Sequence, residues 1–304
     1  MATPIADREK TTGPPRRAII AVTSAHAPLY PDGKETGVFI TEALHPFKVF
    51  KKAGFEVDLV SETGTYQADW LSQQDKWLPA EDKKIWEDSN SEFRKKLDAG
   101  LKPGDFNPDN YGIFFASAGH ASLIDYPEAK GLQTMASKMY GDGAIISAVC
   151  HGGAIFPGVL NQLTDKPIIH GRKVTGFTTK GEEEEGVLDT IKSWNRPTIE
   201  KAAADCGATY VAPPGPWDSF TQTDERIVTG ANPASAEATA EAAVKAFEEL
   251  TKIPRMDHDY KGGGMNYRSK EDNAHPVIKG KSGLDLIDQD GEPTRTIEPG
   301  VAGK

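Results

Sequence analysis

Short apolar segments alternate with amphipathic segments through most of the chain. Residues 17–24, 111–117 and 144–149 are almost continuously apolar, which is typical of strands buried on both faces of a sheet. Residues 55–61 alternate between apolar and polar side chains, and this pattern also predicts a strand. Shorter runs predict further strands at residues 173–177, 209–212 and 226–229.

The segments between these strands have the spacing of helices. In residues 38–54 the apolar side chains recur at helical intervals: Phe39, Ala43, Phe47 and Phe50. Pro46 should kink or divide this helix, and Gly54 should cap its C-terminal end. Other helices are predicted at residues 83–97, 127–140 and 198–206, and from residues 232–235 to about residue 251.

Strands that alternate with helices predict an α/β fold, in which helices cover both faces of a mostly parallel sheet. We therefore expect a flavodoxin-like three-layer sandwich over residues 17–252. Residues 62–105 are polar and irregular, and we expect this insertion to cover one end of the sheet. Residues 1–16 are predicted to be a flexible lead-in, and residues 253–304 a polar tail that is largely disordered or lies on the surface.

Composition narrows the class of protein. The net charge of −10 disfavours nucleic acid and anionic membranes as partners. The sequence has no apolar run of membrane-spanning length, and its N-terminus has no apolar signal segment, so we expect a cytoplasmic protein. It contains two cysteines, Cys150 and Cys206, and no cluster of cysteine and histidine at zinc-ligand spacing.

The most informative segment is AVCHGGAIF, residues 148–156. A strand that stops at a turn of small residues and continues as a short helix exposes the turn residue at the carboxyl edge of the sheet, as in a nucleophile elbow. The turn residue here is Cys150, and a thiolate at a helix N-terminus is stabilised by backbone N–H groups. A buried structural cysteine is the alternative, but His151 and the two glycines after it favour a catalytic residue.

Three further segments place polar residues near this turn. Gly119 and His120 follow the strand at residues 111–117, and Glu182 follows the strand at 173–177. Glu42 lies among apolar residues of the first helix. A carboxylate on that helix usually faces solvent, but on the inner side it could exchange protons with the cysteine or with a substrate.

Several motifs occur together and in order: EALHP at 42–46, SAGHA at 117–121, AVCHG at 148–152 and GPWD at 215–218. In this respect the chain resembles the glutathione-independent glyoxalase branch of the PfpI superfamily, which includes heat-shock chaperone–glyoxalases. The resemblance extends from about residue 17 to about residue 252. It implies the fold of the class I glutamine amidotransferase-like domain.

The resemblance also implies roles for individual residues. Cys150 is the expected nucleophile, His151 the base beside it, and Glu42 a buried acid hydrogen-bonded to the thiol. Glu182 is expected to orient the histidine, although it begins a run of four glutamates, Glu182–Glu185, so the register is open.

Other positions have weaker implied roles. The backbone N–H groups of Gly119 and His151 match oxyanion-hole positions. His120 is expected to form the pocket wall or to be structural. Trp217 is expected to anchor a turn, with pocket lining as the second interpretation.

The implied reaction converts methylglyoxal or another 2-oxoaldehyde to a 2-hydroxy acid such as lactate, without glutathione or a metal cofactor. Either His151 or Glu42 is the base that moves the proton between carbons. Homodimers and unfolded client proteins are the implied macromolecular partners. The alternatives are a holdase chaperone, a cysteine amidase, peptidase or protein deglycase, and a redox sensor in which Cys150 is oxidised reversibly.

Overall fold

Six strands form the central sheet in the order β11-β12-β6-β5-β1-β4. Their bounds are β1 Arg17–Val22, β4 Glu56–Ser61, β5 Ile113–Ala116, β6 Ile145–Val149, β11 Thr221–Asp224 and β12 Ile227–Gly230. Every neighbouring pair is parallel except β11 with β12 at the edge. The computed structural model describes residues 14–252, 286–287 and 293–295, and the chain divides into two units, residues 1–255 and 256–304.

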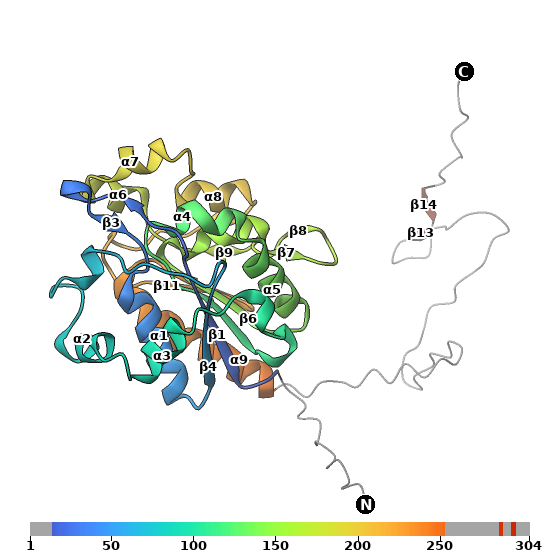
Figure 1. Ribbon diagram of the computed structural model, residues 1–304. Helices are drawn as coiled ribbons and strands as arrows, with labels where there is room; N and C mark the ends of the chain where they lie inside the picture. The colour runs from blue at the N-terminus through green and yellow to red at the C-terminus, as the bar shows by residue number, and fades with distance from the viewer. Residues whose placement is uncertain (1–13, 253–285, 288–292, 296–304) are drawn as a thin grey trace, which may run out of the picture. The chain divides into compact units, whose positions relative to one another are not determined.

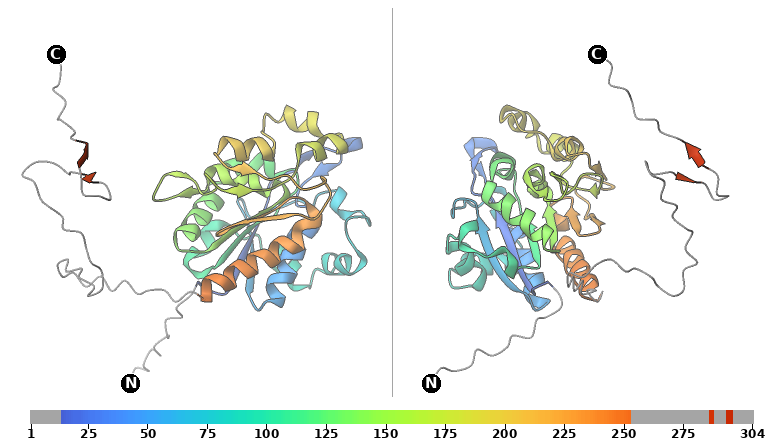
Figure 2. Two further views of the ribbon diagram at one scale, coloured as in Figure 1. Left: turned by 180° about the vertical axis from the view of Figure 1, so that it is seen from behind. Right: turned by 90° about the vertical axis from the view of Figure 1, so that its right-hand side faces the viewer.

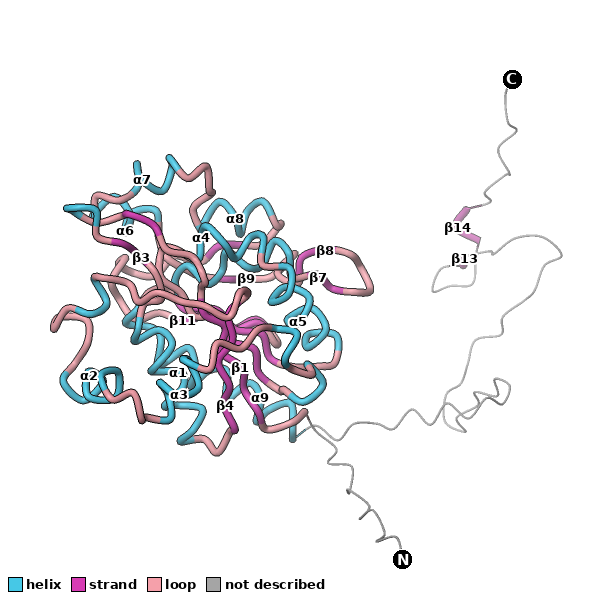
Figure 3. The backbone as a smooth tube through the Cα atoms, viewed as in Figure 1, coloured by secondary structure: helices cyan, strands magenta, loops and turns pink. Residues whose placement is uncertain are grey.

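The five parallel strands have the 2-1-3-4-5 order of flavodoxin-like folds, because β4, β1, β5, β6 and β12 are neighbours in that sequence. The direction of winding reverses between β1 and β5, and ligands of such sheets bind beside this switch point at the carboxyl ends of the strands. The loops that leave these ends are drawn in pink in Figure 3. The predicted α/β sandwich is therefore confirmed.

Helices cover both faces of the sheet (Figure 1). Ile19 and Ala21 of β1 belong to one hydrophobic core, together with residues of α5, whereas Ile20 belongs to a second core with residues of α1 and α9. Figure 2 shows α9 in orange beside the blue helix α1. The helices are α1 Ile40–Lys52, α2 Ala80–Glu87, α3 Glu92–Asp98, α4 Ser122–Asp125, α5 Lys130–Gly141, α6 Thr179–Glu185, α7 Leu188–Ser193, α8 Ile199–Asp205 and α9 Ala236–Lys252.

Helix α1 is continuous and has a well-defined C-terminal cap. α1 is not divided at Pro46, contrary to one of the two expectations for that residue. Gly54 has φ +80° directly after the helix, as its predicted capping role requires. The N–H groups of Gly54 and Phe55 donate to the carbonyls of Lys51 and Phe50, which is the Schellman pattern of a helix C-terminus.

The predicted helix at residues 83–97 is wrong as a single element. Helix α2 ends at Glu87 and α3 starts at Glu92. Between them the Asp88 carboxylate accepts the N–H of Asn90, and the Ser91 hydroxyl caps α3 by accepting the N–H of Arg94. These side chains satisfy backbone groups locally, so the helix stops and restarts.

The predicted strands at residues 173–177 and 209–212 lie outside the central sheet. They are reduced to β9 Lys173–Val174 and β10 Thr209–Tyr210, which pair only with each other. The remaining short strands of the first unit are β2 Ala27–Pro28 with β3 Glu35–Thr36, and β7 Leu160–Asn161 with β8 Lys166–Pro167. The edge strand β11 and the helices α6 and α7 were not predicted.

The second unit contains one described pair of antiparallel strands, β13 Leu286–Ile287 and β14 Pro293–Arg295. The expectations for the lead-in and for most of the tail concern residues outside the described part of the chain. Within the described part, none of the helices is long and apolar enough to span a membrane.

Candidate active site

Cys150 lies where β6 ends and a 3₁₀ helix, η6 Cys150–Gly158, begins. Its φ of +56° is unusual for a residue with a side chain, as expected of a strained nucleophile elbow. Gly152 follows in the same turn, where a Cβ atom would collide with the carbonyl oxygen of Ala116 on β5. Glycine is therefore required for the turn to pass this closely over the neighbouring strand.

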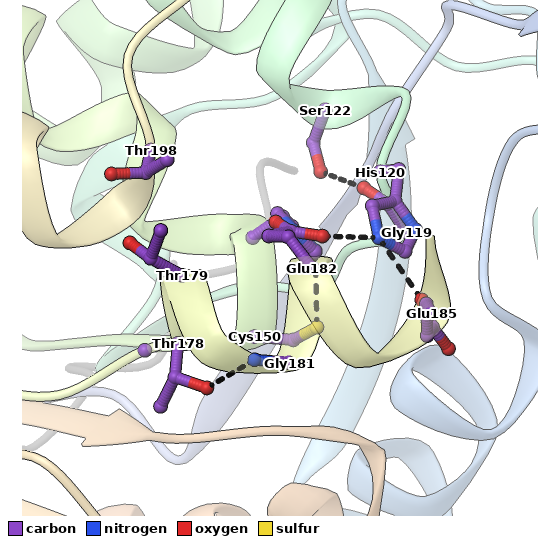
Figure 4. A network of polar contacts seen from close by, with 12 residues as sticks. Gly119, His120, Ser122, Cys150, Thr178, Thr179, Gly181, Glu182, Glu185 and Thr198 are labelled. Atoms are coloured by element: carbon purple, nitrogen blue, oxygen red, sulfur yellow. Dashed lines mark hydrogen bonds and ion pairs between the residues drawn. The ribbon is translucent and has the colours of Figure 1, made fainter. Parts of the chain in front are cut away.

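A chain of short contacts runs from the thiol to a carboxylate. The Sγ atom of Cys150 is 3.2 Å from Nδ1 of His151, and Nε2 of His151 is 2.6 Å from Oε1 of Glu182. All three residues are buried. Glu182 lies in α6, whose N-terminus is capped by Thr178, and it is Glu182 rather than its neighbours that contacts His151. Figure 4 shows Cys150 and Glu182 in this arrangement.

The protonation of these groups follows from their surroundings. Burial alone would raise the pKa of Glu182, but His151 and His120 outweigh it and lower this pKa to about 2. An ionised carboxylate only accepts hydrogen bonds, so Nε2 of His151 must carry the proton. Burial lowers the pKa of His151, which keeps the ring neutral with a free lone pair on Nδ1. That lone pair faces the thiol, as a general base should.

The Cys150 thiol itself is held in its protonated form. Its burial and the nearby charge of Glu42 raise its pKa well above the usual value. The backbone N–H of His151, directed at the sulfur, opposes this rise. The thiolate therefore has to form during the reaction, by proton transfer to a base within reach.

Glu42, in the first turn of α1, is fully buried beside this thiol. Burial raises its pKa to about 8, while the adjacent Cys150 and the charge of His120 reduce the rise. Neither carboxyl oxygen has a hydrogen bond to a nitrogen or oxygen donor among the described residues. The Cys150 thiol is the polar group that acts on this carboxyl group as a side-chain hydrogen-bond partner, in agreement with the expected contact between them. A buried carboxyl group with so little compensation is costly, which marks Glu42 as a residue kept for chemistry.

His120 has more contacts than a pocket-wall residue would need. Its Nε2 atom is 2.9 Å from Oε2 of Glu182 and 3.4 Å from Oε2 of Glu185. Burial opposes its protonation, but these two carboxylates raise the pKa of His120 to about 9. Its ring also contacts that of His151, with a centroid separation of 4.2 Å and an angle of 40° between the ring planes. Glu182 is thus held between two histidines.

Gly119 lies at the carboxyl end of β5, with φ of +149°. Its N–H donates to no group among the described residues, so it is free to bind an oxyanion. A Cβ atom at this position would collide with the carbonyl oxygen of Gly37. Both observations are consistent with the oxyanion position implied by the resemblance.

We expect Gly119→Ala to lower the free energy of unfolding by about 1–3 kcal/mol and to lower kcat, because the added methyl group must displace this loop. Gly104→Ala is the matched control, since a Cβ atom there meets nothing within 4 Å. Thermal melting and steady-state kinetics measure the two effects. A destabilised Gly119→Ala with unchanged kcat would exclude this N–H from transition-state stabilisation.

A cavity of about 540 Å³ lies next to the site and is lined by Trp217, Trp77, Leu71, Lys76 and Glu185, among others. Trp217 is 36% exposed and donates its indole N–H to Glu184. Its ring contacts Phe177, which packs on His151. The favoured interpretation of Trp217 as a buried turn anchor is therefore wrong, and the pocket-lining interpretation agrees with the structure.

Several residues of this site were not found from the sequence. Asp69 in the insertion is buried, accepts the hydroxyl of Tyr30 at 2.9 Å, and has a pKa that burial raises. Glu185 adjoins both His120 and the cavity. Asp69 lies in an irregular segment without periodicity. The only available signal for Glu185 was its place one helical turn after Glu182.

The ligating atoms of His120, His151 and Glu182 lie within 4.8 Å of one another, close enough to surround a metal ion. In this structure, however, the Nε2 atom of each histidine already bonds to an oxygen of Glu182. A metal would have to displace both hydrogen bonds. We therefore interpret the three residues as a hydrogen-bonded network.

No family model matches the chain, but individual proteins and a solved structure do, and their names agree with one another. "Glyoxalase 3" of Candida albicans is 51% identical over 232 residues, which cover 76% of this chain and 98% of that protein. "Glutathione-independent glyoxalase HSP31" of Saccharomyces cerevisiae is 47% identical over 234 residues, or 77% of this chain and 99% of that protein. The crystal structure of glyoxalase III from Candida albicans superposes with a TM-score of 0.74, at 51% identity, over 76% of this chain and 97% of that chain.

Proposed function

The chain belongs to the glutathione-independent glyoxalases, and we propose that it converts methylglyoxal or a similar 2-oxoaldehyde to the 2-hydroxy acid, with Cys150 as the nucleophile. The observation that carries this proposal is the contact chain from Cys150 through His151 to Glu182, together with the buried Glu42 beside the thiol. Enzymes of this class need a nucleophile and a base that can move a proton between two adjacent carbons. The site offers both.

In the first step the Cys150 sulfur forms a bond to the aldehyde carbon. Its proton passes to Nδ1 of His151, which lies 3.2 Å from the sulfur. The carbonyl electron pair becomes an alkoxide, and we assign its stabilisation to the backbone N–H groups of Gly119 and His151. Protonation of this oxygen by the imidazolium then gives a hemithioacetal and restores neutral His151.

In the second step a base removes the hydrogen on the carbon bonded to sulfur, and the neighbouring ketone accepts the electron pair and a proton to give an enediol. We assign this base as Glu42, because a pKa of about 8 leaves a usable ionised fraction near neutral pH. Return of the proton to the adjacent carbon, with loss of the hydroxyl proton from the sulfur-bearing carbon, leaves a thioester of the 2-hydroxy acid. The hydroxyl proton lost here balances the one that the ketone oxygen took up. Water then adds to the thioester carbonyl, the C–S bond breaks, and the thiol is regenerated.

The test is incubation of the purified protein with methylglyoxal in the absence of any added thiol, followed by chiral analysis of lactate. We expect one lactate enantiomer to accumulate stoichiometrically with methylglyoxal loss. Absence of lactate at saturating substrate would overturn the proposal. Release of an amine or of a shortened peptide from the corresponding substrates would instead support an amidase, peptidase or deglycase.

We further propose a cytoplasmic location, a homodimer and a second activity as a holdase for unfolded proteins. The reaction requires a reduced Cys150, and reducing compartments keep thiols in that form. One relative bears the name HSP31, which is consistent with a stress role. Cell fractionation, sedimentation velocity and suppression of client aggregation by the Cys150→Ala variant test these three proposals separately.

A further inference from the structure

The carboxylates of Glu182 and Glu185 lie on the same side of α6, one helical turn apart, and both face His120 (Figure 4). The single N–H at Nε2 of His120 bonds to Glu182 at 2.9 Å. Glu185, at 3.4 Å from the same nitrogen, has no hydrogen bond on the facing oxygen Oε2. It therefore acts on His120 through its charge alone.

The position of Glu185 is otherwise unfavourable. Burial raises the pKa of its carboxyl group, and the negative charges of Glu182 and Asp69 add to that rise. The compensating positive charge is His120, with Lys76 as a weaker contributor. The ionisable groups that act on the Glu185 and His120 pair come from five segments of the chain. They are Tyr30, Glu42, Asp69, Lys76, His151 and Glu182.

We propose that Glu185 and His120 form a positioning pair: the Glu185 carboxylate, 3.4 Å from Nε2 of His120, adds its charge to that of Glu182 at the same nitrogen, and His120 in turn holds Glu182 in place behind His151. This inference rests on the proposed function only for its effect on turnover. A protonated imidazole forms a stronger hydrogen bond to a carboxylate than a neutral one does. With Glu182 held at both oxygens, His151 has one orientation and presents Nδ1 to the thiol.

Glu185 also connects this network to the surface, because it lines the cavity beside the active site. The order of contacts from the sulfur outward is His151, Glu182, His120 and Glu185. A change in the charge of Glu185 can therefore alter the protonation state of His120, although Glu185 does not contact the reacting atoms. This makes Glu185 a positioning residue and not a catalytic one.

The first test measures His120 directly and needs no turnover. The ring C–H signals of His120 are assigned by comparison with His120→Gln and titrated by NMR from pH 5 to 11 in the full-length protein. We expect the pKa of His120 to fall by about 1 unit or more in Glu185→Gln, since an opposite charge at this separation shifts a pKa by that amount. Glu185→Asp should keep most of the effect, because the charge is retained.

The matched control is Glu183→Gln. Glu183 lies in the same helix and is removed from the network by its exposure to solvent. The Glu183→Gln substitution should leave the pKa of His120 unchanged. An unchanged His120 pKa in Glu185→Gln, or an equal fall in Glu183→Gln, overturns the proposal whether or not the protein turns over methylglyoxal.

The second test follows the alkaline limb of the pH profile of kcat/KM. Deprotonation of His120 should weaken the hold on Glu182, so in Glu185→Gln the limb moves to lower pH by about the same 1 unit. In the His120→Gln background the added Glu185→Gln change should cause no further shift. A further shift there would mean that Glu185 acts by a route other than His120 and would overturn the pairing.

Discussion

Replacing Cys150 with alanine is expected to lower lactate formation from methylglyoxal by about 10⁴-fold or more, because the covalent intermediate of the proposed mechanism forms on its sulfur. In that mechanism the sulfur bonds to the aldehyde carbon, and the adjacent His151 and Glu42 move its proton and the substrate's. Alanine keeps the small size that the turn at φ +56° accepts, so the fold should persist. Chiral lactate assays and thermal melting measure the two properties.

Cys206→Ala is the control that matches this substitution. Cys206 is the other cysteine, is also buried, and lies in the turn after α8. Its burial raises its pKa to about 11, as burial also raises that of Cys150. Within the described part of the chain, however, no histidine contacts the Cys206 sulfur as His151 contacts that of Cys150, so no base is in place to remove its proton. Full turnover should remain in Cys206→Ala. Residual turnover in Cys150→Ala comparable to the unsubstituted protein would exclude covalent catalysis at Cys150.

The same variant separates catalysis from a chaperone role. A holdase binds unfolded chains through exposed surface, whereas Cys150 is only 4% exposed. We therefore expect Cys150→Ala to suppress aggregation of a client protein as well as the unsubstituted protein does. Parallel loss of both activities would mean that the two share the thiol.

The sequence predicted the catalytic turn because each of its requirements is local. A buried strand, a break at Cys150 and glycine at position 152 are all visible in nine residues, and the structure places them at a strand end with the close approach that glycine permits. Gly119 could be predicted from the sequence for the same reason. Residues whose role depends only on the end of a strand and the turn that follows it can be recognised from the local pattern of apolar residues and glycine.

The network behind the turn depends on tertiary packing, which periodicity does not report. Four consecutive glutamates give no local pattern that distinguishes them. The position where α6 begins, after the Thr178 cap, and its packing against His120 and His151 leave Glu182 facing inward while Glu183 is exposed. The contact of Glu185 with His120 likewise requires α6 to lie over the end of β5. Neither could be derived from residue spacing alone.

The errors in the predicted elements also have physical causes. Residues 88–91 are rich in side chains that bond to the backbone nearby, which ended one helix and began another. The strand predicted at 173–177 stops after Val174, because the N–H of Thr175 is taken by the Thr229 hydroxyl and that of Phe177 by the Cys150 carbonyl. After Val174 the chain therefore leaves the direction of the strand and passes beside Cys150 in the active site.

Replacing Glu42 with glutamine is expected to reduce turnover and to increase stability at the same time. General acid–base catalysis contributes about 10²–10⁴-fold, and we expect a loss of that size because an amide cannot accept the carbon-bound proton. Thiol addition should survive, since His151 is intact, so a hemithioacetal can still form. Unchanged turnover would show that His151 alone performs the proton transfer.

The gain in stability follows from the direction of the pKa shift. Burial raises the pKa of Glu42 from 4.5 to about 8, so the carboxyl group costs nothing extra below about pH 4.5, where both states are protonated. As the pH rises towards 8 the unfolded chain ionises while the folded one resists, and the penalty reaches about 3 kcal/mol at pH 7. Glutamine does not ionise, although its buried amide also lacks partners, so we expect a net gain of at least about 1 kcal/mol.

Denaturant unfolding at pH 5, 7 and 8 measures this difference. The excess stability of Glu42→Gln should be small at pH 5 and should increase with pH, while Glu249→Gln, at an exposed position of α9, should track the unsubstituted protein throughout. A constant difference across this range would mean that the Glu42 carboxyl does not change its protonation on folding. In that case it could not be the acid that exchanges protons near neutral pH, and the second step would have to be assigned to His151. A pH-dependent gain combined with lost turnover would instead identify Glu42 as a residue whose unfavourable burial is retained for its reactivity.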